Sequence, residues 1–148
     1  MYLIDTDILI YSLKGDEQVL EHFRRTAARP KAVSVVSYGE LLLGALKSER
    51  RDHNLARVRR VGELFPVVEV SRTIMETFAS LKAGLETRGR TLDDFDLIIA
   101  ATAMVLGYRL VTNNERHFRR IAGLRLENWA RGPASGPAAD GASEQLEE

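Results

Sequence analysis

Two carboxylates interrupt an apolar run at the start of the chain, in the stretch YLIDTDILIY (residues 2–11). This run reads as a buried β-strand that leads directly into a helix, yet it contains Asp5 and Asp7. Burying an unpaired carboxylate costs several kcal/mol or forces it to take up a proton. Any fold for this chain must therefore supply a partner for both acids where the first strand ends.

The composition is that of one folded domain. The chain has 148 residues, of which 45% are hydrophobic, and this is enough for one core. It has no cysteine, which excludes disulfides and thiolate metal sites. The apolar runs are too short to span a bilayer, and no basic leader precedes a long apolar stretch. We therefore expect a cytoplasmic protein with no membrane segment.

The zero net charge hides an uneven distribution. Residues 132–148 carry four acids and no base, so residues 1–131 hold 21 bases against 17 acids. The last segment has few apolar residues, and we expect a disordered tail after a folded domain of residues 1–131. The basic clusters would attract a polyanion or serve only as solvated helix faces. They are Arg24, Arg25, Arg29 and Lys31; Arg50, Arg51, Arg57, Arg59 and Arg60; and Arg116, Arg119 and Arg120.

Segments of strand length alternate with amphipathic segments of helix length. The pattern predicts a helix that Thr6 or Asp7 caps. It also predicts strands near 2–5, 32–37, 67–70, 108–112 and 124–128, and helices over 16–28, 37–50, 51–65, 73–88 and 91–106. This alternation indicates an α/β layered fold with a mostly parallel sheet, in which ligands bind beyond the carboxyl ends of the strands.

Acids and amides gather at that predicted edge of the sheet. They are Asp5, Asp7, Glu40, Asp96, Thr112, Asn113 and Asn114. A cluster of carboxylates in an apolar setting cannot stay ionised alone, because like charges raise each other's pKa. Mg²⁺ or Mn²⁺ prefers oxygen ligands and would resolve the repulsion, and such a site supports hydrolysis of a phosphodiester.

Structural explanations compete with this one. Asp5 could cap the following helix, and Asp7 could oppose its dipole. Asp96 is harder to explain structurally, because it lies inside an apolar helix where it would need a dedicated donor. Asn114 could be only a turn residue. His117 does not have the spacing of a metal ligand, and we interpret it only as the residue beside Phe118 in the final turn.

Two acids also have the spacing of a capping box, in which a hydroxyl residue precedes an acid by three positions. Ser37 and Glu40 form one such pair, and Thr91 and Asp94 form the other. On spacing alone, Glu40 and Asp94 are helix caps, although a capping Glu40 would still point toward the sheet edge.

Three segments, in this order, carry a family resemblance: YLIDTDILIYSLKG, SVVSYGELLLGA and DDFDLIIAATAMVLGYRLVTNNERHFRRIAGLRLENW. They resemble the PIN-domain ribonucleases, and most closely the VapC-type toxins of bacterial VapBC toxin–antitoxin modules. The resemblance covers about residues 1–130. It implies a three-layer α/β/α sandwich with a mostly parallel sheet, dependence on Mg²⁺ or Mn²⁺, and endonucleolytic cleavage of structured RNA of the tRNA or rRNA class. It also implies a homodimer and inhibition by a cognate VapB-type antitoxin.

The resemblance also assigns roles to single residues. Asp5, Glu40 and Asp96 match the family's metal-binding acids, Thr6 the hydroxyl residue beside the first of them, and Thr112 the threonine that closes the fourth strand. Basic residues would hold the RNA backbone. These are Arg116, Arg119 and Arg120.

Two positions depart from the family pattern. Asn114 stands where the family often has Asp, and Asp7 stands where it commonly has Asn. An amide is a neutral, weaker ligand, so we expect Asn114 to assist at the catalytic site, and a second tightly bound metal is in doubt. The extra charge of Asp7 could offset the charge missing at position 114.

Two other functions stay open at this point. The sequence Asp5-Thr6-Asp7 resembles the nucleophile loop of haloacid-dehalogenase-type phosphatases, but their chemistry needs a later lysine, and Lys82 is the last one in this chain. The second alternative is a PIN scaffold that binds RNA or a partner without cleaving it, which Asn114 keeps open.

Overall fold

Five short parallel strands form the centre of the fold. In the computed structural model, which describes residues 1–131, they are β1 (Tyr2–Ile4), β2 (Lys31–Ser34), β3 (Val67–Val68), β4 (Arg109–Val111) and β5 (Leu126–Glu127). Their order is β3-β2-β1-β4-β5, and every pair is parallel. The chain winds outward from β1 to β3 and then returns to the other side of β1. The strand order therefore reverses between β1 and β4, which is where such sheets bind ligands.

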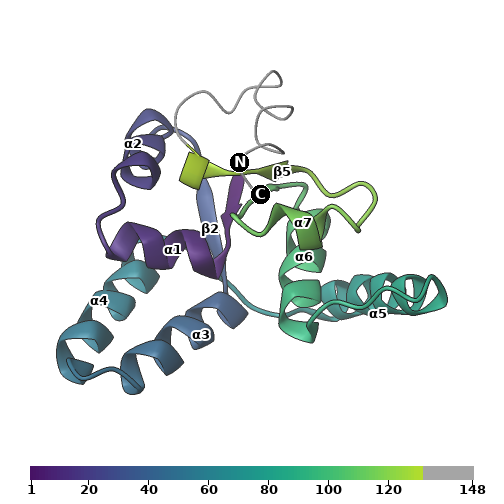
Figure 1. Cartoon of the computed structure of the whole chain (residues 1–148), viewed down its shortest axis with the longest axis horizontal. Coiled ribbons are helices and arrows are strands. Elements are labelled where there is room, and N and C mark those ends of the chain that lie inside the picture. The colour runs from purple at the N-terminus through teal and green to yellow at the C-terminus, as the bar shows by residue number, and fades with distance from the viewer. Residues whose placement is uncertain (132–148) are drawn as a thin grey trace.

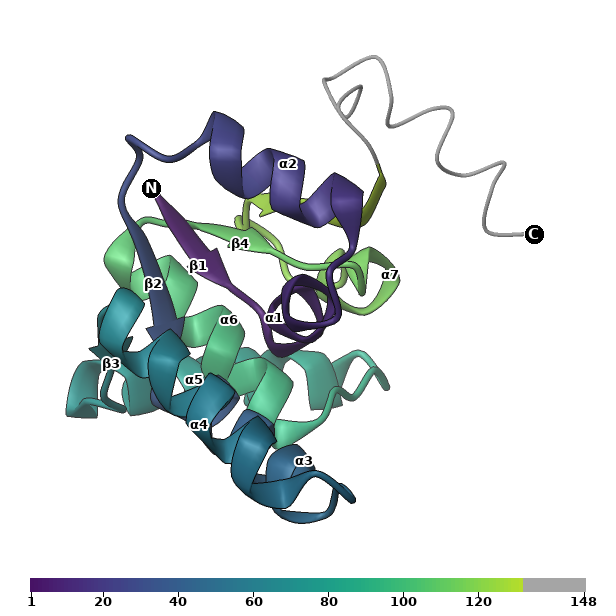
Figure 2. The same ribbon diagram turned by 90° about the vertical axis from the view of Figure 1, so that its left-hand side faces the viewer.

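Helices cover both faces of the sheet, which gives three layers (Figures 1 and 2). One face packs against α1 (Thr6–Leu13), α2 (Glu17–Arg25), α3 (Val35–Leu46), α4 (Arg51–Leu64) and the 3-10 turn η1 (Trp129–Arg131). The other packs against α5 (Arg72–Thr87), α6 (Asp94–Leu106) and α7 (Glu115–Phe118). This confirms the expected three-layer α/β/α sandwich.

The strands are apolar because both of their faces are buried. Along β1, Tyr2 and Ile4 belong to the core beneath α1 and α2, whereas Leu3 belongs to the core beneath α6. β4 divides in the same way, with Val111 in the first core and Leu110 in the second. Side chains alternate across a strand, so a strand covered on both faces shows a continuous apolar run.

The beginning of α3 differs from the sequence expectation. The strand before it ends at Ser34, whose hydroxyl accepts the N–H of Val36 at 3.1 Å and caps the helix. The β-branched pair that follows Ser34 thus lies in the first helical turn and not in a strand. The capping box of Ser37 and Glu40 is therefore wrong, since both residues lie inside the helix. A cap that forms three residues earlier overrides the strand propensity of valine.

Two other helix starts also differ. Asp5 caps α1, which confirms the capping role considered for it, and the expectation that Thr6 or Asp7 would be the cap is wrong. Asp93 caps α6 by accepting the N–H of Phe95 at 2.8 Å, so the predicted box of Thr91 with the following acids is wrong. Runs of polar residues offer several caps, and spacing alone does not select among them.

Three further points concern the end of α6, membrane-spanning helices and the last residues of the chain. Gly107 ends α6 in the left-handed conformation (φ 69°), which suits a glycine at the end of a helix. Within residues 1–131, no helix combines the length and the apolar character that crossing a membrane requires. The expected disorder of residues 132–148 falls outside the described part of the chain.

Candidate active site

The carboxyl ends of β1 and β4 bring two residues that are 107 positions apart into contact. The register pairs Ile4 with Val111, so the residues after them lie side by side. The Thr112 hydroxyl donates to Asp5 Oδ2 at 2.8 Å, and the backbone N–H of Thr6 donates to Oδ1 at 2.8 Å. Asp5 is 5% exposed. Both of its oxygens are thus held by neutral donors, which fixes the orientation of the carboxylate without neutralising its charge.

Asp7 lies two residues further along, in the first turn of α1. Its Oδ1 accepts the N–H of Ile8 at 2.7 Å, and its Oδ2 accepts the N–H of Asn113 at 3.0 Å. Burial raises the pKa of Asp7, and these two amide donors oppose the rise. Asp7 therefore anchors the loop after β4 to α1, in addition to any effect on the helix dipole.

Glu40 reaches the same edge from α3. Its Oε1 accepts a hydrogen bond from the Thr6 hydroxyl at 2.8 Å, and that hydroxyl also contacts Ser37 Oγ at 2.9 Å. Ser37 is fully buried. The three side chains connect α3 to the start of α1. The Glu40 carboxylate therefore points toward Thr6, next to Asp5, and not toward the start of its own helix.

Asp96 projects toward these acids from α6. Its pKa is raised to about 6, mainly by burial and then by the negative charges of Asp93, Glu40 and Asp7. The pKa of Asp5 is raised to about 7 by burial and then by the charge of Asp7, with a smaller contribution from Asp96. The hydrogen bond between Thr6 and Glu40 and the charge effects of these acids on one another associate Asp5, Glu40 and Asp96 with the same edge of the sheet, while their shared role in binding a metal stays a prediction.

The donor set at this rim fits a hard divalent cation. Within residues 1–131, Asp5, Asp7 and Asp96 form no ion pair with a basic side chain. In the same part of the chain, no set of three or more His, Asp or Glu side chains is already placed to hold an ion. Mg²⁺ commonly takes only one or two protein carboxylates and completes its shell with water and phosphate oxygens. Asp5 and Asp96 suit that role, with Glu40 beside them.

Comparison with known proteins identifies the family of this fold. The family model of the PIN domain matches residues 2–124, which is most of the chain. The chain belongs to the PIN-domain family. The expectation of a phosphatase of the haloacid dehalogenase type has no support in this match.

Relatives of this PIN domain carry ribonuclease names. It is 34% identical over 129 residues to Ribonuclease VapC2 of Haemophilus influenzae, a match that covers 86% of this chain and 97% of the relative. It is 32% identical over 130 residues to the tRNA(fMet)-specific endonuclease VapC of Shigella flexneri, covering 87% and 98%. The solved structure of VapBC2 from Rickettsia felis bound to a promoter DNA fragment superimposes with a TM-score of 0.82 at 28% identity, covering 86% and 98%. The resemblance to VapC-type PIN domains is confirmed.

The hydrogen bonds of Asn114 go to Thr112 and His117 and not to the acids. Its backbone N–H donates to Thr112 Oγ1 at 3.0 Å, and its side-chain nitrogen lies 2.9 Å from Nδ1 of His117. The charge of His117 also acts on Asp96 and lowers its pKa. His117 therefore lies at the rim of the site, although its lack of metal-ligand spacing had set it aside. The signal in the sequence was its position three residues after Asn114, which is one helical turn.

A buried polar network that sequence reasoning missed supports the loop after β4. The Asn128 side-chain amide donates to Asn113 Oδ1 and to Glu115 Oε2, both at 3.1 Å. The Asn113 amide donates to the Tyr11 hydroxyl at 3.2 Å, and Arg131 lies 3.7 Å from Glu115. These contacts fix Asn113, whose backbone holds Asp7, and so connect the last strand to the site.

The arginines expected to hold RNA have partners within the protein. Arg119 lies 3.8 Å from the carboxylate of Glu115, and Arg120 donates to the carbonyl of Thr91 at 3.0 Å. Arg116 is exposed on α7. All three lie on or just after the helix that carries His117, so their placement beside the site agrees with the expectation while their contact with RNA stays a prediction.

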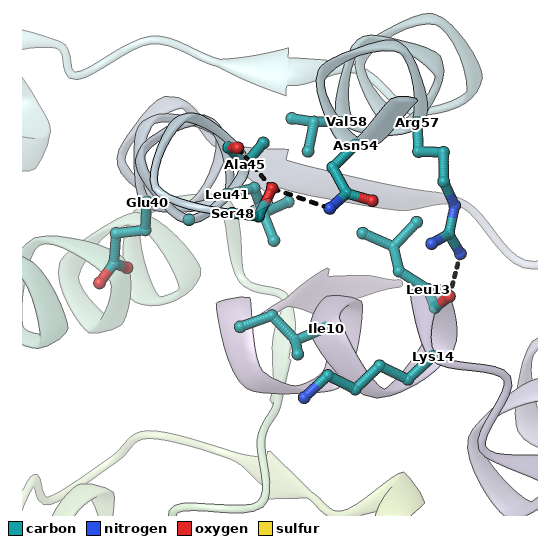
Figure 3. Close-up of a pocket in the computed structure, with 11 residues that line it drawn as sticks. Ile10, Leu13, Lys14, Glu40, Leu41, Ala45, Ser48, Asn54, Arg57 and Val58 are labelled. Atoms are coloured by element: carbon teal, nitrogen blue, oxygen red, sulfur yellow. Dashed lines mark hydrogen bonds between the residues drawn. The ribbon is translucent and has the colours of Figure 1, made fainter. Parts of the chain in front are cut away.

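A groove borders the site between α1, α3 and α4 (Figure 3). It has a volume of about 450 Å³ and is floored by Leu13, Leu41, Ala45 and Val58. Glu40 lies at one end of the groove, which places an apolar surface directly beside the acidic rim.

Proposed function

We propose that this PIN domain is a Mg²⁺-dependent endoribonuclease that acts in the cytoplasm as the toxin of a type II toxin–antitoxin pair. The observation that carries the proposal is the convergence of Asp5, Glu40 and Asp96 at the switch point between β1 and β4. The ribonuclease names of its relatives support the reaction class.

Asp5 and Asp96, with Glu40 beside them, are the residues that would hold Mg²⁺ or Mn²⁺. When bound, such an ion activates a water and stabilises charge on a phosphodiester. The protein contributes orientation, because Thr112 and the Thr6 amide hold both oxygens of Asp5. Thr6 also holds Glu40, so the acids from α1 and α3 share one hydrogen-bonded unit. This arrangement gives Thr6 and Thr112 supporting roles and gives Asp7 the role of fixing the loop after β4.

The substrate that we propose is a structured RNA of the tRNA or rRNA class. The support is the Shigella flexneri relative, which is named a tRNA(fMet)-specific endonuclease. We propose that Arg116 on α7 and Arg119 and Arg120 just after it hold the phosphate backbone of an RNA that enters the acidic rim. RNA is recognised mainly by its shape and by unstacked bases, so the choice among RNAs lies in the surface around the rim.

The partner that we propose is a VapB-type antitoxin, with the toxin itself a homodimer. The support is the Rickettsia felis structure, which is described as VapBC2 bound to DNA. The apolar groove that ends at Glu40 offers a surface on which a C-terminal segment of the antitoxin would lie beside the acids (Figure 3).

A scaffold that binds RNA without cleaving it is the second candidate, because Asn114 replaces a commonly acidic residue. The test is cleavage of total RNA by the full chain in Mg²⁺ and in EDTA. We expect cleavage only in Mg²⁺, and a loss of at least about 100-fold in Asp5→Asn and Asp96→Asn, because each substitution removes a charged ligand. Asp52→Asn, an exposed position in α4, is the matched control and should cleave normally.

The outcomes of this test separate the candidates. Cleavage that persists in EDTA would contradict the metal mechanism. Tight RNA binding with no cleavage in either buffer would favour the scaffold. In cells, both site variants should relieve the growth arrest that the wild type causes, and arrest by both would refute the assignment.

A further inference from the structure

His117 occupies a position that neither the packing of the fold nor the carboxylate site explains. Its imidazole is exposed, while the next residue, Phe118, is the fully buried side chain that anchors α7. An exposed histidine on a short helix gives little stability through burial. Its one hydrogen bond in the described chain joins Nδ1 to the Asn114 side chain at 2.9 Å.

The contact with Asn114 determines which imidazole nitrogen of His117 can donate a hydrogen bond outward. The carboxamide nitrogen of Asn114 can only donate, so Nδ1 of His117 accepts. In the neutral imidazole the proton then resides on Nε2. Nε2 has no hydrogen-bond partner within residues 1–131. The ring is thus held by one edge and presents an N–H at the other.

The same contact connects His117 rigidly to the site. Asp5 accepts from Thr112 at 2.8 Å, Thr112 accepts from the Asn114 N–H at 3.0 Å, and Asn114 holds His117. His117 also acts electrostatically on Asp96, in agreement with this placement. The hydrogen-bonded chain from Asp5 through Thr112 and Asn114 therefore holds His117 next to the acidic edge.

We infer that His117 is a substrate-contacting residue whose Nε2–H donates a hydrogen bond to an oxygen of the RNA phosphodiester at the acidic rim, and that Asn114 positions it. The inference rests on the proposed function and gives Asn114 a role other than metal binding. A phosphate at the rim needs a hydrogen-bond donor, since the acids around it supply only acceptors.

The test uses two replacements that copy different edges of the ring. His117→Gln places a side-chain amide near the position of Nε2, whereas His117→Asn reaches only to the position of Nδ1. With total RNA below saturation, we expect His117→Asn to lower kcat/KM roughly 10- to 100-fold, the loss typical of one hydrogen bond to a charged group. His117→Gln should stay within about fivefold of the wild type. His53→Asn, an exposed histidine on α4, is the control and should not change the rate.

Asn114→Ala tests the positioning role. It should lower kcat/KM, and it should add little to His117→Asn in the double variant, because both substitutions break one unit. Equal rates for His117→Asn and the wild type would overturn the inference, and so would equal losses in the Gln and Asn variants. Circular dichroism and thermal unfolding identify a variant that fails to fold.

A failure of the proposed function gives a different pattern. If the wild type does not cleave in Mg²⁺, the dissociation constant for unfractionated tRNA replaces the rate as the readout. His117→Asn should then bind severalfold more weakly than His117→Gln. Equal affinities of these two variants would overturn the contact between His117 and RNA independently of catalysis.

Discussion

Asp5 shows what a single residue contributes at this site. It is a carboxylate whose two oxygens each accept one hydrogen bond from a neutral donor, in surroundings that disfavour its charge. Hydrogen bonds from Thr112 and Thr6 lower its pKa, but burial and the charge of Asp7 raise it more. The free protein therefore holds an unfavourable charge exactly where a cation or a proton would relieve it.

The first prediction concerns the stability of the metal-free protein as pH changes. The folded pKa of Asp5 is about 7 against 3.8 for the ordinary group, so the folded state binds the proton more tightly. The resulting stabilisation is complete below pH 3.8 and is lost as the pH rises through 7. Asp5→Asn cannot ionise, so in EDTA it should be more stable than the wild type at pH 8, by about 1–3 kcal/mol.

Urea unfolding in EDTA measures this difference. The advantage of Asp5→Asn should shrink between pH 8 and pH 5, and Asp52→Asn should show no such trend. A difference that does not change with pH would contradict the account of Asp5. Adding Mn²⁺ at pH 8 should stabilise the wild type but not the variant.

At the residue level, the sequence predicted which acids converge but not how they are held. Asp5 and Asp96 stood out because acids are costly in apolar segments, and both lie at the rim. The role of Thr6 depends on hydrogen bonds to Ser37 and Glu40, more than 30 residues away in the chain. His117 was missed because only metal-ligand spacing was considered for it, whereas its spacing of one helical turn from Asn114 was the informative pattern.

At the level of elements, α7 and the loop before it are held in place by a residue that follows β5, near the end of the described part of the chain. Asn128, which follows β5, is 4% exposed and donates to both Asn113 and Glu115. Its own Oδ1 accepts the N–H of Ala130 at 2.9 Å. One side chain thus joins three backbone segments, and this network fixes the loop that carries Asn114 into the site.

The second prediction tests this network. Asn128→Ala should lower the free energy of unfolding by about 2–4 kcal/mol, because it leaves several buried polar groups without partners. Asn54→Ala is the matched control, since the Asn54 amide donates only to Ser48 Oγ in a more exposed connection and should cost under about 1 kcal/mol. Urea unfolding measures both. Equal losses in the two variants would show that the network adds no stability.

Element types could be predicted from the sequence, whereas their starts could not. The strands were evident because both faces are covered, as Leu3 and Ile4 show. The start of α3 was misplaced because Ser34 and Ser37 are both competent caps, and only the end of β2 selects the first of them. Helix starts depend on this competition, which involves tertiary contacts.

For the whole molecule, the order of the strands matters more than any one element. The reversal between β1 and β4 places the residues after both strands at one edge. The layered fold and its mostly parallel sheet followed from the alternation of segments. The strand order could be expected only from the resemblance to PIN domains, because pairing between distant strands leaves no local pattern in the sequence.

The third prediction concerns charge across the molecular surface. Residues 1–131 carry more bases than acids, while several of the acids gather at the rim. RNA binding by the non-cleaving Asp96→Asn variant should therefore weaken steeply with salt. With about three phosphate contacts, we expect Kd to rise roughly 20- to 40-fold between about 50 and 200 mM salt. A flat salt response would refute the contribution of the basic surface.

The most direct test of the account is the location of Mn²⁺ by anomalous diffraction from crystals of the full chain soaked in the ion. We predict a peak at the edge between β1 and β4, with carboxylate oxygens of Asp5 and Asp96 about 2 Å from it. The peak should disappear in Asp96→Asn crystals and persist in Asp52→Asn crystals. If Mn²⁺ binds elsewhere, or if Asp5 and Asp96 make no contact with it, the central claim is wrong.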